Sequence, residues 1–115
     1  MNNFRELKVW QKSIDLLIDI YNATSSFPER EKYNLIAQVQ RSAVSIPRNI
    51  AEGCGRHSNP AFKQFLSVSL GSAYELETQL IISNKLNILE AESFNGLQSR
   101  LVEIQKMIYG LMNTL

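Results

Sequence analysis

Residues 38–53 read Gln38-Val39-Gln40-Arg41-Ser42-Ala43-Val44-Ser45-Ile46-Pro47-Arg48-Asn49-Ile50-Ala51-Glu52-Gly53. Apolar residues recur in this run at steps of three and four, which is the pattern of one face of an α-helix. Pro47 disturbs that helix, because it has no N–H to donate and its ring crowds the carbonyl of Ala43, at a cost of about 3 kcal/mol. The apolar period keeps its phase across the proline, so we expect one helix that bends at Pro47 and ends at the Gly53/Gly55 pair. The alternative is a helix that ends near Ile46 and a second helix that begins at Pro47.

A stripe of polar side chains runs beside this apolar face and consists of Arg41, Ser45, Arg48, Asn49, Glu52 and Arg56. The hydroxyl of Ser42 or Ser45, or a water, is available to the Ala43 carbonyl, which loses its helical partner at Pro47. Segment 41–63 also holds Lys63 and His57 and only one acidic residue, whereas the net charge of the whole chain is +1. A basic patch of this size indicates either a solvated helix face or a surface that binds phosphates.

Three further segments have a helical apolar period. The first runs from about Glu6 to about Ala23, with one apolar line at Leu7, Trp10, Ile14, Leu17 and Tyr21 and a second at Val9, Leu16 and Ile20. The helix that contains Pro47 starts near Pro28 or a few residues later and runs to about Glu52. Asn59 as N-cap and Pro60 at the first helical position predict a third helix that extends to about Leu86. The fourth has a heptad pattern at Phe94, Leu97, Leu101, Ile104, Ile108, Leu111 and Leu115.

Four helices joined by short loops predict an all-α fold, an antiparallel up-down-up-down four-helix bundle that forms a single domain over residues 1–115. The apolar lines beyond those needed for one core favour a homo-oligomer. No apolar run approaches the roughly 20 residues that span a bilayer, so we expect no membrane association. The single cysteine and the lack of a signal-peptide pattern at the N-terminus favour a cytoplasmic protein.

The centre of the third helix is rich in small residues, namely Ser67, Ser69, Gly71, Ser72 and Ala73. Because small side chains let backbones approach, we expect a close contact with the helix of Pro47 at Gly71. Glu75 and Glu77 follow, and we expect one of them to pair with Arg41 or Arg48 of that helix. Such a pair fixes the register of two helices more than it adds to stability.

The residue inventory argues against an enzyme and against a cofactor or metal. Gly53-Cys54-Gly55 lacks the lysine and the spacing of a phosphate-binding loop. Cys54 and His57 provide two metal ligands, but a site needs further Cys or His residues, which the chain lacks. Neither Glu75 nor Glu77 has a histidine three residues later, as a di-iron bundle requires.

Several segments of the chain, in order, resemble a known family. They are Phe4–Lys12, Phe27-Pro28, Gln38–Gly53, Arg56 and Gly71–Leu80. The chain resembles the bacterial four-helix bundle proteins encoded within intervening sequences of 23S ribosomal RNA genes, also called the S23 ribosomal protein family. Members often have two adjacent arginines before the Ser-Ile-Pro segment, and this chain has Gln40 and Arg41 there.

The resemblance implies a four-helix bundle that assembles as a pentamer, similar to the accessory proteins of diversity-generating retroelements, which bind nucleic acid and a reverse transcriptase. The corresponding hypothesis is a non-enzymatic, oligomeric protein that binds RNA or DNA. The residues expected to contact phosphate are Arg41, Arg48, Arg56, Lys63, Lys8 and Lys12. Those expected to hold the bundle are Ser45, Pro47, Asn49, Glu52, Gly53, Gly71, Glu75 and Glu77. The alternative is a scaffold that docks a partner protein and binds no nucleic acid.

Overall fold

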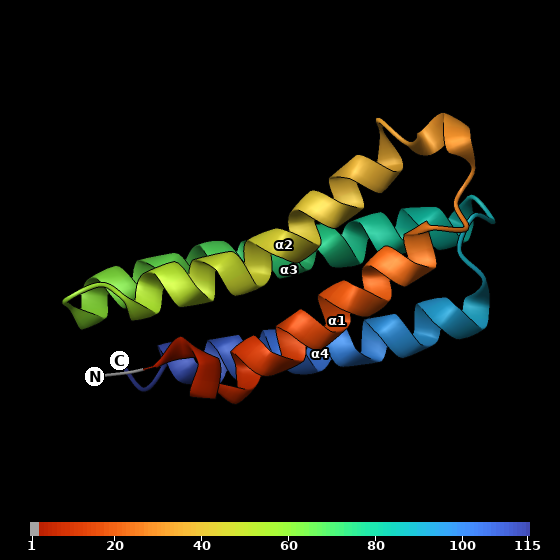
Figure 1. Cartoon of the computed structure of the whole chain (residues 1–115). Coiled ribbons are helices and arrows are strands. Elements are labelled where there is room, and N and C mark those ends of the chain that lie inside the picture. Colours follow the sequence, from red (N-terminus) through yellow and green to blue (C-terminus); the bar gives the residue numbers. More distant parts are fainter. Residues whose placement is uncertain (1–2) are drawn as a thin grey trace.

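The computed structural model describes residues 3–115, and within them it contains helices and no strand. The four α-helices are α1 (Lys8–Thr24), α2 (Leu35–Cys54), α3 (Asn59–Lys85) and α4 (Ala91–Met112). Contacts join α1 to α2, α2 to α3, α3 to α4 and α4 to α1, so the four helices enclose a common core. Figure 1 shows α2 lying along α3 and α1 lying along α4. The predicted all-α four-helix bundle is therefore confirmed.

Two short 3-10 helices, η1 (Phe4–Glu6) and η2 (Glu29–Glu31), shift the starts of α1 and α2 from the expected positions. Asn3 caps η1 by accepting a hydrogen bond from the Arg5 N–H at 3.0 Å. The chain then leaves the helical conformation at Leu7, which makes Lys8 the first residue of α1. After Pro28, η2 and a turn occupy the residues before Leu35, so α2 takes the later of the expected starts.

The N-cap of α3 differs by one residue from the prediction. Ser58 has extended backbone angles, and its hydroxyl accepts a hydrogen bond from the Ala61 N–H at 3.2 Å. Asn59 is already the first residue of the helix and Pro60 the second. A serine cap satisfies the same unpaired N–H groups as an asparagine, which explains why the sequence alone did not separate the two.

The core is apolar and receives residues from all four α-helices and from two loops. Its fully buried members include Leu16, Ile20, Ile46, Ile50, Leu66, Leu76, Leu80, Leu101, Ile104 and Ile108. On α4 these are members of the predicted heptad pattern. On α1 the second apolar line is buried, whereas Tyr21 of the heptad line is 44% exposed. The heptad line of α1 therefore lies at the edge of the core.

Pro47 lies inside α2, which is a single helix from Leu35 to Cys54 and not two. The proline is buried against the rest of the bundle. The hydroxyls of Ser42 and Ser45, which with a water were the alternatives for the Ala43 carbonyl, bond to side chains of α3.

None of the helices in residues 3–115 has the length and the apolar content that crossing a membrane requires.

Candidate nucleic-acid interface

Three serine-mediated hydrogen bonds join α2 to α3. The Ser42 hydroxyl donates to Oε1 of Glu75 at 3.1 Å, and the hydroxyls of Ser45 and Ser72 lie 2.7 Å apart. Further along, the hydroxyl of Ser69 donates to the backbone carbonyl of Ile46 at 2.9 Å. Side chains as short as serine reach each other only when the two helices lie close together. The small residues of α3 therefore contact α2, as the sequence indicated.

Asn49 forms hydrogen bonds with Ser45, which lies one turn earlier on the same helix. Its Nδ2 donates to the backbone carbonyl of Ser45 at 2.8 Å and to the Ser45 hydroxyl at 3.0 Å. Asn49 and Ser72 are both buried, at 7% and 9% exposure, so these polar groups need partners inside the protein. Both form a hydrogen bond with the Ser45 hydroxyl, which provides those partners.

The close approach of the two helices occurs at Gly53 and not at Gly71. A Cβ atom on Gly53 would lie 2.7 Å from Cβ of Phe65 and 2.9 Å from Cδ1 of Phe62, which is closer than side-chain atoms pack. A Cβ on Gly71 would meet nothing within 4 Å. The prediction that Gly71 provides the close contact is therefore wrong within this chain, because a side chain at this exposed position of α3 would face open space.

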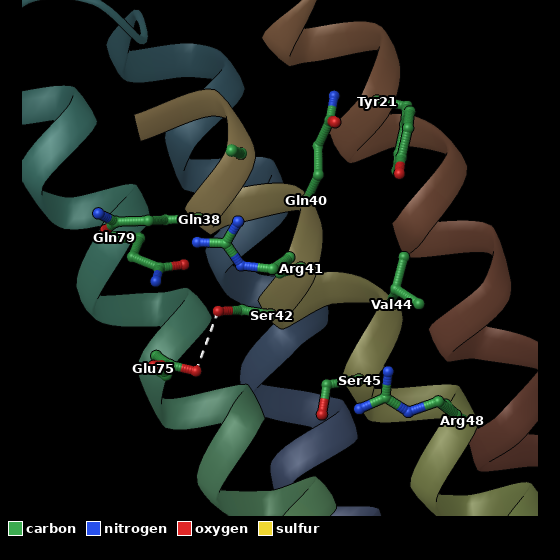
Figure 2. A pocket seen from close by; sticks show the side chains of 11 residues that line it. Tyr21, Gln38, Gln40, Arg41, Ser42, Val44, Ser45, Arg48, Glu75 and Gln79 are labelled. Atoms are coloured by element: carbon green, nitrogen blue, oxygen red, sulfur yellow. Dashed lines mark hydrogen bonds between the residues drawn. The ribbon is translucent and has the colours of Figure 1, made fainter. Parts of the chain in front are cut away.

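A groove of about 700 Å³ lies over α2 and is flanked by α1 and α3 (Figure 2). Its lining is mostly polar and consists of Tyr21, Ala37, Gln38, Gln40, Arg41, Ser42, Val44, Ser45, Arg48, Glu75 and Gln79. Figure 2 shows the guanidinium of Arg41 directed toward α3, on the side where Gln79 lies. The groove therefore joins the basic residues of α2 to an acidic and an amide side chain of α3.

The expected ion pairs between these arginines and the glutamates of α3 are not formed. Among residues 3–115, the ion pairs within 4.0 Å are Lys12–Glu103 and Arg100–Asp19, and both join α1 to α4. Glu77 instead accepts hydrogen bonds from the amides of Gln98 and Gln105 on α4, at 3.1 and 2.9 Å. Glu75 accepts from Ser42, as described above. Arg41 and Arg48 are consequently exposed cations with no carboxylate partner in the described chain.

The six cations expected to contact phosphate fall into three groups. Arg41 and Arg48 lie in the groove, seven residues apart, which is about 10 Å along a helix. Arg56 lies in the turn between α2 and α3, where its guanidinium stacks over the Phe65 ring at 4.6 Å, and Lys63 lies near the start of α3. The remaining two belong to the first half of α1. Of these, Lys8 is exposed and Lys12 is held by Glu103 at 3.3 Å.

Glu52, the one acidic member of the polar stripe, is exposed on α2. Gln40, which stands where family members often carry an arginine, donates a hydrogen bond to the Thr24 hydroxyl at 3.1 Å. This bond ties α2 to the end of α1 at the rim of the groove.

Seven residues of the groove were not predicted as site residues, namely Tyr21, Ala37, Gln38, Gln40, Ser42, Val44 and Gln79. Gln79 follows Glu75 by four positions, which places both on one face of a helix, and this spacing was the available signal. Tyr21 reads in the sequence as one more member of an apolar line on α1. Its exposure depends on where α2 crosses α1, which the sequence pattern does not specify.

Two features of the structure concern metal and thiol chemistry. Within residues 3–115 no group of three or more His, Cys, Asp or Glu side chains is placed to hold a metal ion. Cys54 is 2% exposed, and this burial raises the pKa of its thiol above the ordinary value. A raised pKa leaves less thiolate at neutral pH, which is the opposite of what a nucleophilic cysteine needs.

Comparison with known proteins identifies the family. The fold resembles the crystal structure of a protein of unknown function from the S23 ribosomal protein family of Bacteroides thetaiotaomicron, with a TM-score of 0.82. The two chains are 24% identical, and the alignment covers 90% of this chain and 97% of that one. No curated protein matches the sequence. The family model described as 23S rRNA-intervening sequence protein matches residues 5–110, so the chain belongs to the 23S rRNA-intervening sequence protein family.

Proposed function

We propose that this protein is a non-enzymatic, oligomeric protein that binds RNA or DNA through the basic residues of α2. The observation that carries the proposal is the pair Arg41 and Arg48, which are exposed beside a polar groove and have no carboxylate partner in the described chain. A guanidinium presents a planar fork of N–H donors that matches a phosphate group. Arg56, just after α2, extends the same stripe, Lys63 near the start of α3 adds a further cation, and Lys8 and Lys12 of α1 are outer contacts.

The proposed oligomer is a pentamer, as the resemblance to the retroelement accessory proteins implies. Several large apolar side chains support an assembly of this kind, because they are exposed on the single chain: Ile18, Val68, Ile82, Leu86 and Tyr109. A ring would repeat the basic stripe once per subunit. Linked weak sites bind a long polyanion much more tightly than one site does. Light scattering of the purified protein measures the mass of the assembly.

The proposal also includes the finer features of the fold. Short connections between successive helices favour the antiparallel up-down-up-down order, and the proline inside α2 favours a bend at Pro47. We place the protein in the cytoplasm, where a nucleic-acid ligand is present.

A salt titration of RNA and DNA binding tests the proposal. We compare the wild-type chain with the double variant Arg41→Ala/Arg48→Ala, using fluorescence anisotropy of a labelled single-stranded 20-mer at several salt concentrations. Each lost phosphate contact should reduce the salt slope by about 0.7 for single strands. The double variant should therefore bind more weakly at low salt and with a slope that is flatter by about 1.4 per subunit engaged. The matched control is Lys85→Ala/Lys106→Ala, which removes two exposed cations outside the proposed surface.

Two results would contradict the proposal. If the wild-type chain binds neither RNA nor DNA at low salt, the protein-docking scaffold becomes the better description. If both double variants weaken binding equally, the groove has no special part in it. The scaffold is the second candidate because the exposed apolar residues of α3 fit a partner protein as well as another copy of the chain.

A further inference from the structure

The groove over α2 has two chemically different sides. The side formed by α2 carries the guanidinium groups of Arg41 and Arg48, and the side formed by α3 carries the carboxylate of Glu75 and the amide of Gln79 (Figure 2). Phosphate oxygens fit the first side and would be repelled by Glu75 on the second. A ligand that fills both sides must therefore combine an anionic group with a neutral group that donates hydrogen bonds.

Gln79 has an unsatisfied hydrogen-bond acceptor. Its side chain is only 8% exposed, and its Oε1 atom is buried with no hydrogen-bond partner in the described chain. Nearly all buried polar atoms in folded proteins have a partner, and leaving one without costs about 1–3 kcal/mol. A residue that only filled space at this position would be more stable as leucine. The Oε1 atom of the amide is therefore available to accept a hydrogen bond from a donor outside the chain.

Glu75 is positioned one helical turn before Gln79 on the same face of α3. Its carboxylate is oriented by the Ser42 hydroxyl through Oε1, which fixes the side chain at the groove. No cation of the described chain neutralises it within 4.0 Å. The α3 side thus holds two neighbouring acceptors, an exposed charged one on Glu75 and a covered neutral one on Gln79.

We infer that this groove binds an unpaired guanine of single-stranded RNA or DNA, and this inference rests on the proposed function. The Watson–Crick edge of guanine carries two adjacent donors, the N1–H and the 2-amino group, which match the carboxylate of Glu75 and the carbonyl of Gln79. Adenine and cytosine each offer one amino group there, and uracil offers one N–H between two acceptors. The edge is occupied in a base pair, so only an unpaired guanine can use it.

The remaining geometry is compatible with a nucleotide. A volume of about 700 Å³ falls within the range of about 300–1,000 Å³ that small-molecule sites have. With the base against α3, the phosphates on either side of the guanosine lie over α2, within reach of Arg41 and Arg48. The terminal torsion of a glutamine is broad, so the Gln79 amide can turn its covered oxygen toward an arriving base without a rotamer penalty.

The test uses unstructured ten-residue oligouridines, labelled with fluorescein, in which one central base is guanine, hypoxanthine, adenine or uracil. Hypoxanthine lacks the 2-amino group and keeps the N1–H, so it removes one of the two contacts. We expect the guanine oligomer to bind the wild-type chain about tenfold more tightly than the uracil and adenine oligomers, with hypoxanthine between them. A DNA series of the same design distinguishes the two sources of guanine, and a guanine preference in either series supports the inference.

The variants Gln79→Leu and Glu75→Gln locate the preference on α3. Each removes one of the two contacts and should lower the ratio of guanine to uracil affinity to an intermediate value, as hypoxanthine does in the wild-type chain. The ratio is the correct readout, because Glu75→Gln also removes a negative charge and strengthens the binding of every oligomer. The control Gln64→Leu, an exposed glutamine on the same helix, should keep the wild-type ratio. Gln79→Leu should retain the wild-type Tm, because the side chain that it removes has an unpaired acceptor.

The possible failures are distinguishable. If every oligomer binds the wild-type chain equally, or if the guanine ratio survives in both variants, the guanine site is wrong while nucleic-acid binding stands. If no oligomer binds at low salt, the proposed function and this inference are both wrong. The comparison of guanine with hypoxanthine uses the wild-type chain alone, so it holds even if a variant fails to fold.

Discussion

The contacts of α2 with α3 and of α1 with α4 use different chemistry. Between α2 and α3, the hydrogen bonds of Ser42, Ser45 and Ser69 run between the two helices, and Gly53 lies directly against two phenylalanines. Between α1 and α4, polar contact consists of two ion pairs, Lys12–Glu103 and Arg100–Asp19, whose side chains are about half exposed.

The difference shows how each contact fixes its geometry. Short side chains with hydrogen-bonding partners across the interface are satisfied at one separation and one register only. Long charged side chains at the surface reach each other over a range of separations, and water screens their attraction. We therefore expect changes in the α2–α3 contact to be costly and changes in the α1–α4 ion pairs to be mild.

The largest expected effect concerns the reactivity of Cys54, which follows Gly53 at the close-packed end of α2. The thiol is 2% exposed and its pKa is raised by burial, so at pH 8 it has less thiolate than an exposed cysteine. We expect the native protein to react with iodoacetamide on the order of a hundredfold more slowly than the protein unfolded in guanidinium. The rate should also reach its maximum at a higher pH in the native protein than in the unfolded protein, because the native thiolate forms only as the pH rises through the raised pKa.

The control for this measurement is the double variant Cys54→Ala/Ser67→Cys, which moves the thiol to an exposed position on α3. Its thiol should react at nearly the same rate in the folded and unfolded states. Equal rates for both cysteines in the folded state would show that the end of the α2–α3 contact opens readily, which would remove the distinction between the two contacts.

The next effect is the response to a single methyl group at two glycines. Gly53→Ala places a Cβ 2.7 Å from Cβ of Phe65, an atom that moves only with the backbone of α3, so the helices must separate. We expect the free energy of unfolding to fall by about 2 kcal/mol. Gly71→Ala meets no atom within 4 Å and should raise it by about 0.5–1 kcal/mol. Urea unfolding at one protein concentration measures the change in the free energy of unfolding for both variants. Two changes of the same sign would contradict the packing described.

A smaller effect is expected for one hydroxyl of the α2–α3 contact. Ser69 is fully buried, and its hydroxyl donates to the Ile46 carbonyl at 2.9 Å. Ser69→Ala should lower the free energy of unfolding by about 1 kcal/mol. Ser67→Ala, two residues away and exposed, should change it by less than about 0.5 kcal/mol. If the two variants unfold at the same urea concentration, the serine bonds do not stabilise this contact.

The smallest effect belongs to the α1–α4 ion pairs. A double-mutant cycle on Lys12 and Glu103, with alanine at each position, should give a coupling of about 0.2–1 kcal/mol at low salt. Raising the salt concentration to 1 M should remove it, because the Debye length is then only about 3 Å. A coupling larger than that of the Ser69 hydroxyl bond, or one that persists in high salt, would mean that the two contacts are more alike than their chemistry indicates.

Much of the fold could be predicted from the periodicity of the sequence. The four helices follow from apolar residues at steps of three and four, and the heptad pattern of α4 matches its buried positions. On α1, which of the two apolar lines is buried depends on the helices that α1 contacts, and the sequence does not specify those contacts. On α3 the sequence located the small residues that face α2 but named the wrong glycine. A glycine is close to a neighbour or open to solvent according to the angle at which two helices cross, and no local pattern records that angle.

The candidate site was less predictable than the fold. The arginines of α2 could be named because charge patterns are visible in a sequence, and Arg41 and Arg48 do lie together in one groove. The partners of Glu75 and Glu77 could not be named, because opposite charges on adjacent helices suggest ion pairs by default. In the structure Ser42 donates a hydrogen bond to Glu75, and Gln98 and Gln105 donate hydrogen bonds to Glu77. Gln79 was not named because an unsatisfied acceptor becomes visible only when all its neighbours are placed.

The hydrogen-bonded group of Ser45, Asn49 and Ser72 has a consequence for how the sequence can drift. The Ser45 hydroxyl bonds to both Ser72 and Asn49, so replacing Ser45 alone leaves the buried Ser72 hydroxyl without its partner. This single substitution is therefore costly, whereas a joint replacement by apolar residues of similar size is nearly neutral. Among relatives, Ser45 should change only together with Ser72, and their correlated substitution would record the α2–α3 register in sequence data alone.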